Sequence, residues 1–451
     1  MFGSSGIRGT VNEDLTADLA AKVGLGIATL KKPRLAFVAR DTRVSGSLLR
    51  DSVASGLMAG GVNVEDLGIL PTPVLAYLTM KLQADVGVMI TASHNPPQYN
   101  GIKIFDSDST SYDEQKQEQI QTIIEENRFK RAAWPDIGTA RHSEKAFVYE
   151  EIIAKKVKLR KKWRVIVDPG CGATYRLAPK ILKSLGCDVV ALNAQPDGFF
   201  PARSPEPNAE ALKPLTELVR KLHADLACAY DGDGDRVSFI DEYGCFADFD
   251  RALAAYAGYS LSKKRGGTVV TNVEASMSFE AMIEHLSGKP IRTKVGDVYV
   301  SGQIKKQQAV FGGEPCGAWI HPQFHFCPDG ILSSALLLKA LEEEGKTLSE
   351  FVSQSPEYPT LRMNVPCRDD LKHAVVEKVG NVLRKMYATQ GDFSVVDGVR
   401  LALKDGWVLI RASGTEPLIR LTAEGESLKA ARRILKENAR ILEELSGGKR
   451  K

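Results

Sequence analysis

The sequence has 451 residues, of which 43% are hydrophobic and 26% are charged, values typical of a soluble globular protein. Its net charge of +4 is small for this length and indicates no nucleic-acid partner, and the lack of 18 consecutive apolar residues or a signal-peptide pattern predicts no membrane partner. Seven cysteines without a C-x-x-C pair are typical of reduced thiols, so we expect a cytoplasmic protein, with three or four domains.

The first block of the chain, 1–145, alternates apolar strands with helical patterns. Strands are expected at 34–39, 62–67 and 84–90, and helices at 45–59 and 72–82. This alternation predicts a mostly parallel sheet. The last of these strands leads into Ser93 and His94, which are followed by two prolines.

Two further blocks, 146–248 and 249–358, repeat the alternation of apolar strands with helices. The fourth block, 359–451, combines Lys- and Glu-rich helices with strands such as 407–410. We therefore expect an α/β protein of four domains, with three similar αβ sheet domains and a C-terminal α+β domain. Polar loops follow strands in the first three blocks, and such strand ends are where open α/β sheets bind ligands.

The sharpest local motif is DGDGDR at 231–236, in which Asp231, Asp233 and Asp235 alternate with glycines. Carboxylates at this spacing can turn their oxygens onto one hard cation, and without a cation they would repel one another. An EF-hand is disfavoured because Arg236 stands where that loop needs glycine, and because the flanks look like strands. A solvated acidic turn is the alternative. Arg236 would add a positive charge for an anionic ligand.

The RASGTEP motif at 411–417 follows an apolar strand and offers donors suited to a phosphate. These donors are Arg411, Ser413, Gly414 and Thr415, with Arg420 in the next expected strand. An ordinary turn is the alternative. Two weaker loops are FGSSGIRG at 2–9, either a flexible end or an anion-holding loop, and GEPCG at 313–317, either a turn or a carboxylate acceptor for sugar hydroxyls.

Ser93 and His94 are adjacent, whereas the base of a protease-like triad must reach its serine from elsewhere in the fold. No G-x-S-x-G motif surrounds Ser93 either. The residues fit a serine that carries a phosphoryl group, held by cations such as Lys103. A serine in a proline-stiffened turn is the alternative.

Taken in their order along the chain, and over nearly its whole length, these motifs resemble those of the α-D-phosphohexomutase superfamily. FGSSGIRG is similar to its N-terminal arginine loop, TASHNP (91–96) to its phosphoserine loop, DGDGDR to its magnesium loop, GEPCG to its sugar-specificity loop and RASGTEP to its phosphate-clamping loop. DGDGDR and TASHNP together are highly specific. The resemblance implies four domains around one central cleft, and an isomerase that moves a phosphoryl group within a sugar phosphate.

At the level of single residues, the resemblance implies that Ser93 carries the phosphoryl group. It also implies that Arg8, His94 and Lys103 surround the phosphoserine. It implies one Mg²⁺ per chain, bound by Ser93, Asp231, Asp233 and Asp235. The implied substrate-binding residues are Arg236, Lys294, Glu314, Cys316, Arg411, Ser413, Gly414, Thr415 and Arg420. Phosphoserine would donate to a sugar monophosphate, and the bisphosphate would turn round and return its other phosphate. A sugar bisphosphate is the implied activator, and the fourth domain is expected to close as a lid.

The specificity region looks most like that of archaeal-type phosphoglucosamine mutases, which implies conversion of glucosamine 6-phosphate to glucosamine 1-phosphate. Cys316 and Ala318 replace the Ser and His common in the family; a thiol is a poorer hydrogen-bond donor than a hydroxyl, and Ala318 cannot transfer a proton. His321 or His325 would have to substitute, although each fits a core or surface position better. Mannose, glucose or pentose phosphates are the alternative substrates. A non-catalytic sugar-phosphate sensor and a calcium-stabilised structural protein are the other classes, and we expect a monomer or homodimer.

Overall fold

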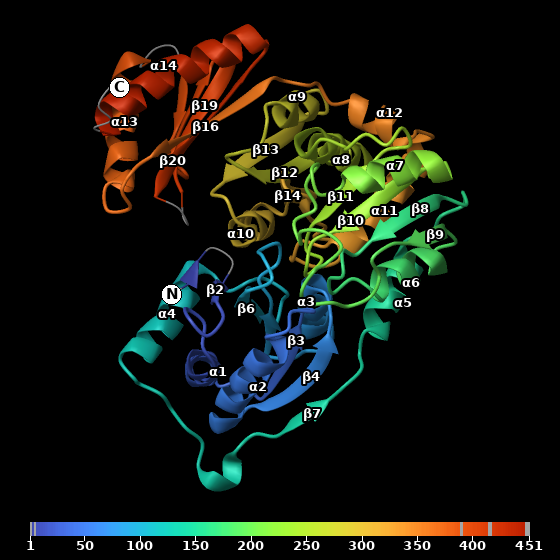
Figure 1. The fold of residues 1–451 in the computed structure, drawn as a ribbon, viewed down its shortest axis with the longest axis vertical. Coiled ribbons are helices and arrows are strands. Elements are labelled where there is room, and N and C mark those ends of the chain that lie inside the picture. Colours follow the sequence, from blue (N-terminus) through green and yellow to red (C-terminus); the bar gives the residue numbers. More distant parts are fainter. Residues whose placement is uncertain (1, 4–5, 388–390, 414–416, 447–451) are drawn as a thin grey trace.

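Four sheets follow one another along the chain in the computed structural model, which describes residues 2–3, 6–387, 391–413 and 417–446. The first three sheets are mixed and flanked by helices, whereas the fourth is antiparallel throughout (Figure 1). This confirms the predicted α/β class, with three αβ units and a C-terminal α+β unit. No helix in these described ranges is long and apolar enough to cross a membrane.

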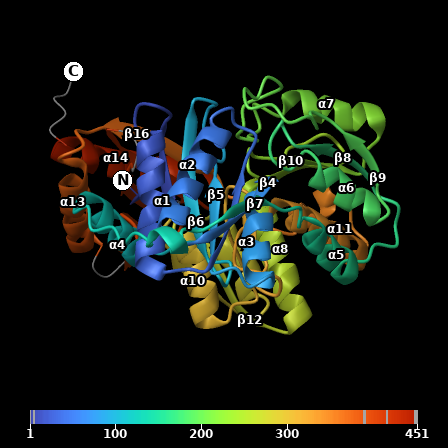
Figure 2. The same ribbon diagram turned by 90° about the horizontal axis from the view of Figure 1, so that it is seen from below.

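The first sheet has the strand order β1-β2-β6-β5-β3-β4-β7. Its strands are β1 (Phe2–Gly3), β2 (Gly6–Thr10), β3 (Leu35–Arg40), β4 (Asn63–Ile69), β5 (Val86–Ile90), β6 (Tyr99–Asp106) and β7 (Ala140–His142). Its helices are α1 (Ala17–Lys31), α2 (Gly46–Ala59), α3 (Thr72–Lys81) and α4 (Glu114–Glu125), and a short 3₁₀ helix, η1 (Trp134–Asp136), precedes β7. Figure 2 shows α1 and α2 side by side, where Gly24 and Gly56 allow their backbones to approach closely.

The second and third sheets have the orders β11-β10-β8-β9 and β13-β12-β14-β15. The second unit contains α5 (Phe147–Lys156), β8 (Arg164–Asp168), α6 (Leu177–Ser184), β9 (Asp188–Ala191), α7 (Lys213–Leu222), β10 (Leu226–Tyr230) and β11 (Val237–Ile240). The third contains α8 (Phe249–Lys264), β12 (Gly267–Asn272), α9 (Ser278–Glu284), β13 (Gly288–Thr293), α10 (Asp297–Gln307), β14 (Phe311–Glu314), β15 (Ala318–Ile320), α11 (Gly330–Glu344) and α12 (Leu348–Ser353). Helix α11 also reaches the second sheet, where Ser334 shares a hydrogen bond with Tyr230.

The same strand connection recurs in the first three units. The pairs β5–β6, β10–β11 and β14–β15 are antiparallel, because each connection is too short for a crossover helix. The three strands that the sequence predicts in the first sheet, β3, β4 and β5, pair parallel as expected. The added strands β6, β2 and β1 pair antiparallel, so the whole sheet is mixed rather than mostly parallel. The three connections hold the TASHNP, DGDGDR and GEPCG motifs, so equivalent positions of three similar sheets deliver three of the expected site loops.

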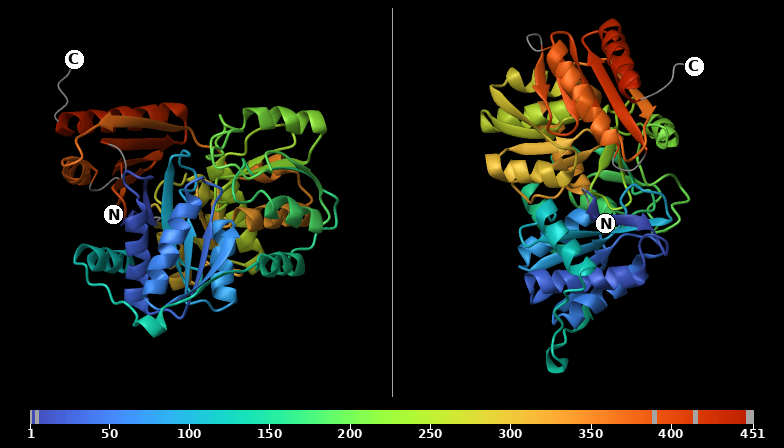
Figure 3. Two further views of the ribbon diagram at one scale, coloured as in Figure 1. Left: turned by 60° about the horizontal axis from the view of Figure 1, so that its bottom comes forward. Right: turned by 90° about the vertical axis from the view of Figure 1, so that its left-hand side faces the viewer.

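The fourth unit contains β16 (Thr360–Pro366), α13 (Lys372–Met386), β17 (Asp392–Ser394), β18 (Val399–Leu403), β19 (Gly406–Ala412), β20 (Leu418–Gly425) and α14 (Leu428–Ser446). It has its own hydrophobic core, whereas one continuous core runs through the first three units, from Phe37 through Trp163 to Trp319. In Figures 1 and 3 the fourth unit lies beside the third, and a small cluster of Val273, Trp407 and Leu409 joins them. The first three units therefore form one packed body with the fourth attached to it. The bounds 1–145, 146–248, 249–358 and 359–451 stay a prediction.

Candidate active site

The loop after β5 brings Ser93 against the loop after β10. Ser93 is buried and has a φ of 52°, a left-handed backbone conformation that is uncommon for serine. Its Oγ donates to Asp231 Oδ2 at 2.6 Å, and its backbone N–H donates to Thr91 Oγ1 at 2.9 Å. The serine is therefore held at both its backbone and its side chain, facing the acidic motif.

A buried arginine, Arg43, holds the Ser93 loop from behind. Its Nε donates to Asp41 Oδ2 at 2.9 Å. Its other four N–H groups donate to the backbone carbonyls of Ser93, Asn95, Pro96 and Tyr99, at 2.6–2.9 Å. All five donors of the guanidinium are thus used, four of them on one loop. This gives the loop a rigid support that the two prolines alone could not supply.

The three aspartates of DGDGDR lie together beneath Ser93. One carboxylate oxygen of each lies within 4.8 Å of the others. Asp233 Oδ1 and Asp235 Oδ1 are buried without a hydrogen-bond partner among the described residues. Buried carboxylate oxygens without a hydrogen bond are costly, and a divalent cation would satisfy them. The cluster therefore fits a metal ion with oxygen ligands.

Lys103, on β6, points into the same cluster. Its ammonium donates to Asp233 Oδ2 at 2.7 Å and to Asp235 Oδ2 at 2.6 Å. Burial opposes the charge on Lys103, but the two carboxylates raise its pKa above the usual value. Burial acts to raise the pKa of Asp233. The charge of Lys103 and the hydrogen bonds from Lys103 and Thr72 outweigh burial, so the pKa of Asp233 lies below its usual value. This ion pair is charged throughout the physiological pH range.

The pKa of Asp231 shifts in the opposite direction to that of Asp233. Burial first, and then the charges of Asp235 and Asp233, raise its pKa well above the ordinary value. Its Oδ1 accepts from the backbone N–H groups of Gly234 at 2.9 Å and Arg236 at 3.2 Å. A metal ion would restore the charged form of this carboxylate by offsetting the repulsion from its neighbours.

Arg8 and His94 complete the surroundings of Ser93. Arg8, on β2, donates to Asn95 Oδ1 at 2.9 Å, and its charge reaches His94. The charge of Arg236, then burial and the charge of Arg8, lower the pKa of His94 to about 2. His94 is therefore a neutral imidazole beside two guanidinium groups, and its Nδ1 lies 3.4 Å from Ser93 Oγ. The structure thus brings together Arg8, Ser93, His94, Lys103, Arg236 and the three aspartates, and the roles that the resemblance implies for them stay a prediction.

The specificity loop lies on the third sheet. Glu314 Oε1 accepts from Asn272 Nδ2 at 2.7 Å and from the Gly296 N–H at 2.8 Å, and burial raises the pKa of this carboxyl. Cys316 is half-buried, and burial raises its pKa to about 12, so it is a neutral thiol. Lys294 is exposed and forms an ion pair at 3.4 Å with Glu114 of the first unit. Its expected role in lining the cleft stays a prediction.

The expected phosphate clamp lies on the fourth sheet. Arg411 on β19 and Arg420 on β20 are directly paired across the two strands. Arg411 donates to Glu274 of the third unit, and its Nη1 lies 3.7 Å from Asp397. Ser413 is buried, whereas Gly414 and Thr415 lie outside the described residues. The two arginines line a groove of about 400 Å³ between the third and fourth units.

The two histidines considered as substitutes for the missing family histidine are buried and engaged by the start of α11. His321 Nε2 pairs with Ser333 Oγ at 2.9 Å, and His325 Nε2 with Asp329 Oδ2 at 2.8 Å. Burial lowers the pKa of His321 to about 3. These contacts agree with the core interpretation of both residues.

Sequence reasoning missed Arg43 and Thr72. Thr72 supports Asp233 by donating from its side chain at 2.5 Å, and its backbone N–H donates to the Asp233 carbonyl at 2.9 Å. A weak signal was present, because both residues lie just after strands of the first sheet, at the same edge as Ser93. Their partners lie about 50 and 160 residues away, which no local motif reveals.

We expect Gly232→Ala to reduce turnover strongly, because a Cβ at Gly232 would lie 2.4 Å from the Ser93 carbonyl oxygen. The Ser93 loop and the acidic loop would then have to move apart, and a displacement near 1 Å can cost about 100-fold in rate. The matched control is Gly302→Ala in α10, where an added Cβ meets nothing within 4 Å. Equal rates for the two variants would contradict the close contact.

The chain resembles known proteins along nearly its whole length. Domains described as phosphoglucomutase/phosphomannomutase alpha/beta/alpha domains I, II and III and C-terminal domain match residues 1–131, 146–244, 248–358 and 363–441. The probable phosphoglucosamine mutase of Methanopyrus kandleri is 45% identical over 438 residues, covering 97% of this chain and 96% of that protein. That of Pyrococcus abyssi is 40% identical over 443 residues, covering 98% of each.

A solved structure gives the same assignment. The crystal structure of a phosphoglucomutase/phosphomannomutase family protein from Burkholderia thailandensis matches with a TM-score of 0.89 at 27% identity, covering 100% of this chain and 99% of that one. The chain therefore belongs to the phosphoglucomutase/phosphomannomutase family, within the phosphohexomutase superfamily. It is an isomerase of the sugar-phosphate mutase class, and the full-length relatives above make it phosphoglucosamine mutase-like.

Proposed function

We propose that the chain interconverts glucosamine 6-phosphate and glucosamine 1-phosphate through a phosphorylated Ser93. The observation that carries this proposal is the position of Ser93 Oγ, 2.6 Å from Asp231 Oδ2 and next to His94, on which the positive charges of Arg236, Arg8 and Lys103 act. Phosphoryl transfer depends on positioning and on neutralising the charge of the transferring group, and these residues supply both. The sugar itself is inferred from the curated relatives.

In the first half-reaction, the free hydroxyl oxygen of the sugar monophosphate bonds to phosphorus as the Ser93 Oγ–phosphorus bond breaks. In net terms the hydroxyl proton replaces the phosphoryl group on Ser93. The sugar bisphosphate then turns round, and Ser93 takes the other phosphate by the reverse exchange. A sugar bisphosphate from solution would prime an unphosphorylated chain in the same way.

Mg²⁺ is the proposed cofactor, and Asp231, Asp233, Asp235 and an oxygen on Ser93 would hold it. When bound, Mg²⁺ would neutralise charge on the transferring group. The chain's own residues would position Ser93 and bind the sugar and its phosphates. Arg43 fixes the loop that carries Ser93, Arg8 and Lys103 face the phosphoryl group, and Glu314 would accept from sugar hydroxyls. Arg411, Ser413 and Arg420, with Gly414 and Thr415, would hold the phosphate that is not transferred.

The test is a mutase assay with Mg²⁺ and a trace of matching bisphosphate, on glucosamine, glucose, mannose and ribose phosphates in parallel. We expect the highest kcat/KM for glucosamine phosphate, by about tenfold or more, which corresponds to one additional hydrogen bond to its charged amino group. A better rate on another sugar would mean that Cys316 and Ala318 redirect the pocket. If a chain that carries phosphate on Ser93 turns over none of these sugar phosphates, a non-catalytic sensor would be favoured.

A further inference from the structure

The face of the fourth sheet that meets the third unit is built in rows. Antiparallel register places Asn364, Arg420 and Arg411 side by side across β16, β20 and β19. The next row toward the third unit contains Arg362, Thr422 and Leu409. Residues paired across strands, and residues two apart along a strand, share one face of a sheet. Arg362 is therefore on the same face as the two clamp arginines, one row away.

Arg362 lines the same groove as Arg411 and Arg420. This groove has a volume of about 400 Å³, and its opposite wall is formed by Glu274 and by Pro315 of the specificity loop. Arg362 lies one strand across from β20 and two residues along the strand direction from Arg420. The Cα atoms of Arg362 and Arg420 are therefore roughly 8 Å apart. Arginine side chains can close that separation, so both guanidinium groups can reach one phosphate.

The balance of charge differs between these arginines. Arg411 is already neutralised by Glu274 and Asp397. Arg362 is exposed, and no carboxylate of a described residue lies within ion-pair distance of its guanidinium. A cation that faces a groove and has no ion-pair partner is available to an anionic ligand.

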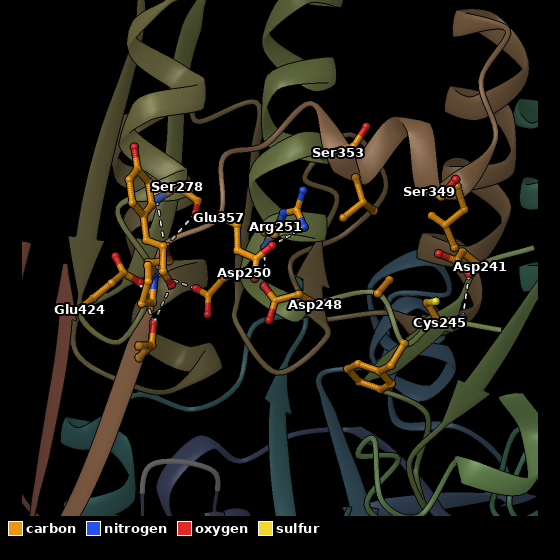
Figure 4. Close-up of a pocket in the computed structure, with 18 of the residues that line it drawn as sticks. Asp241, Cys245, Asp248, Asp250, Arg251, Ser278, Ser349, Ser353, Glu357 and Glu424 are labelled. Carbon is orange, nitrogen blue, oxygen red and sulfur yellow. Dashed lines mark hydrogen bonds and ion pairs between the residues drawn. The ribbon is translucent and has the colours of Figure 1, made fainter. Parts of the chain in front are cut away.

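Arg362 also lines a second cavity, between α8, α12 and the start of β16. Figure 4 shows this cavity. It has a volume of about 610 Å³ and is lined by several carboxylates, among them Asp248, Asp250 and Glu424. Burial raises the pKa of Asp250 to about 7, and the Arg362 charge acts in the opposite direction. Arg251 and Trp407 bind Glu357 and Glu424 respectively. The Arg362 charge therefore acts on Asp250 across this cavity, although no ion pair joins Arg362 to a carboxylate among the described residues.

We propose that Arg362 is a further phosphate-binding residue, which contacts the non-transferred phosphate of the substrate together with Arg420. This inference rests on the proposed function, and it extends the phosphate clamp from the 411–417 loop and β20 to the edge strand β16. Asn364, exposed beside Arg420, lies in position to accompany it.

Calorimetric titration tests the inference in a Ser93→Ala background, so that no turnover disturbs binding. The ligands are glucosamine 6-phosphate, glucose 6-phosphate and inorganic phosphate. We expect Arg362→Gln to weaken binding of both sugar phosphates by about tenfold or more, as loss of a charge-assisted hydrogen bond would. Arg362→Lys keeps the charge without the planar fork, and should give an intermediate affinity.

The matched control is Arg368→Gln, in the same unit, where the exposed arginine forms a bidentate pair with Asp370. It should leave the affinities unchanged. The parent chain in this assay is Ser93→Ala. If Arg362→Gln binds the sugar phosphates with affinities within twofold of the parent, the inference is overturned. If its melting temperature is also lower, Arg362 instead serves to attach the fourth unit. If the parent binds and the unsubstituted chain isomerises sugar phosphates, the proposed function survives that result. If the parent binds no sugar phosphate, both fall.

Discussion

Ser93→Ala should abolish mutase turnover, with a residual rate below about one thousandth of the unsubstituted chain, because the reaction then has no atom to carry the phosphoryl group. The backbone of the loop should keep its place, since Arg43 binds main-chain carbonyls and Thr91 binds the main-chain N–H of residue 93. The lost hydrogen bond to Asp231 is worth about 1 kcal/mol, a small part of the stability of a domain.

Three measurements check this expectation: the initial rate, the mass of the intact chain and the melting temperature. The mass should show a phosphate on the unsubstituted chain after exposure to a sugar bisphosphate, and none on the variant. Ser355→Ala is the matched control, because Ser355 is buried and its Oγ has no partner among the described residues. A Ser93→Ala rate of a few percent would remove Ser93 from its role as the carrier.

The parts of the site that the sequence predicts well are the contiguous ones. DGDGDR and TASHNP each put several functional side chains on one loop, so their chemistry is visible before any fold is known. The strand alternation also predicts that both loops lie at strand ends, which the sheets confirm. Their meeting could be expected only through the family resemblance, because Ser93 and Asp231 lie 138 residues apart.

Residues that act from a distance were not predictable in this way. Arg43 follows a strand in an ordinary Asp-Thr-Arg turn, and its role depends on four carbonyls that its sequence neighbours do not supply. Arg362 stands in a short strand whose inward face is set by pairing with β20. Lys294 forms an ion pair with Glu114 of the first unit, a partner that its sequence neighbours do not reveal, and its place in the cleft stays a prediction. Tertiary pairing, which has no local signature, decides each of these.

Asp233→Asn should reduce Mg²⁺-dependent turnover by at least about 100-fold, since it removes a charged ligand from the proposed metal site. The effect has a second source in the chain itself. Asp233 Oδ2 accepts from both Thr72 and Lys103, and a neutral amide would leave the Lys103 ammonium with Asp235 as its remaining partner in this cluster. Lys103 would then be displaced relative to Ser93, so saturating Mg²⁺ should not restore the full rate.

Thermal denaturation separates metal binding from catalysis. Mg²⁺ binds the folded chain and should raise the melting temperature of the unsubstituted protein in a concentration-dependent way. The same titration of Asp233→Asn should show little or no rise. The control is Asp188→Asn, which loses a half-exposed surface pair with Arg164 and should respond to Mg²⁺ as the unsubstituted chain does. An equal response from Asp233→Asn, with an unchanged rate, would place the metal elsewhere and leave the buried Asp233 Oδ1 and Asp235 Oδ1 atoms without a hydrogen bond or a metal ion.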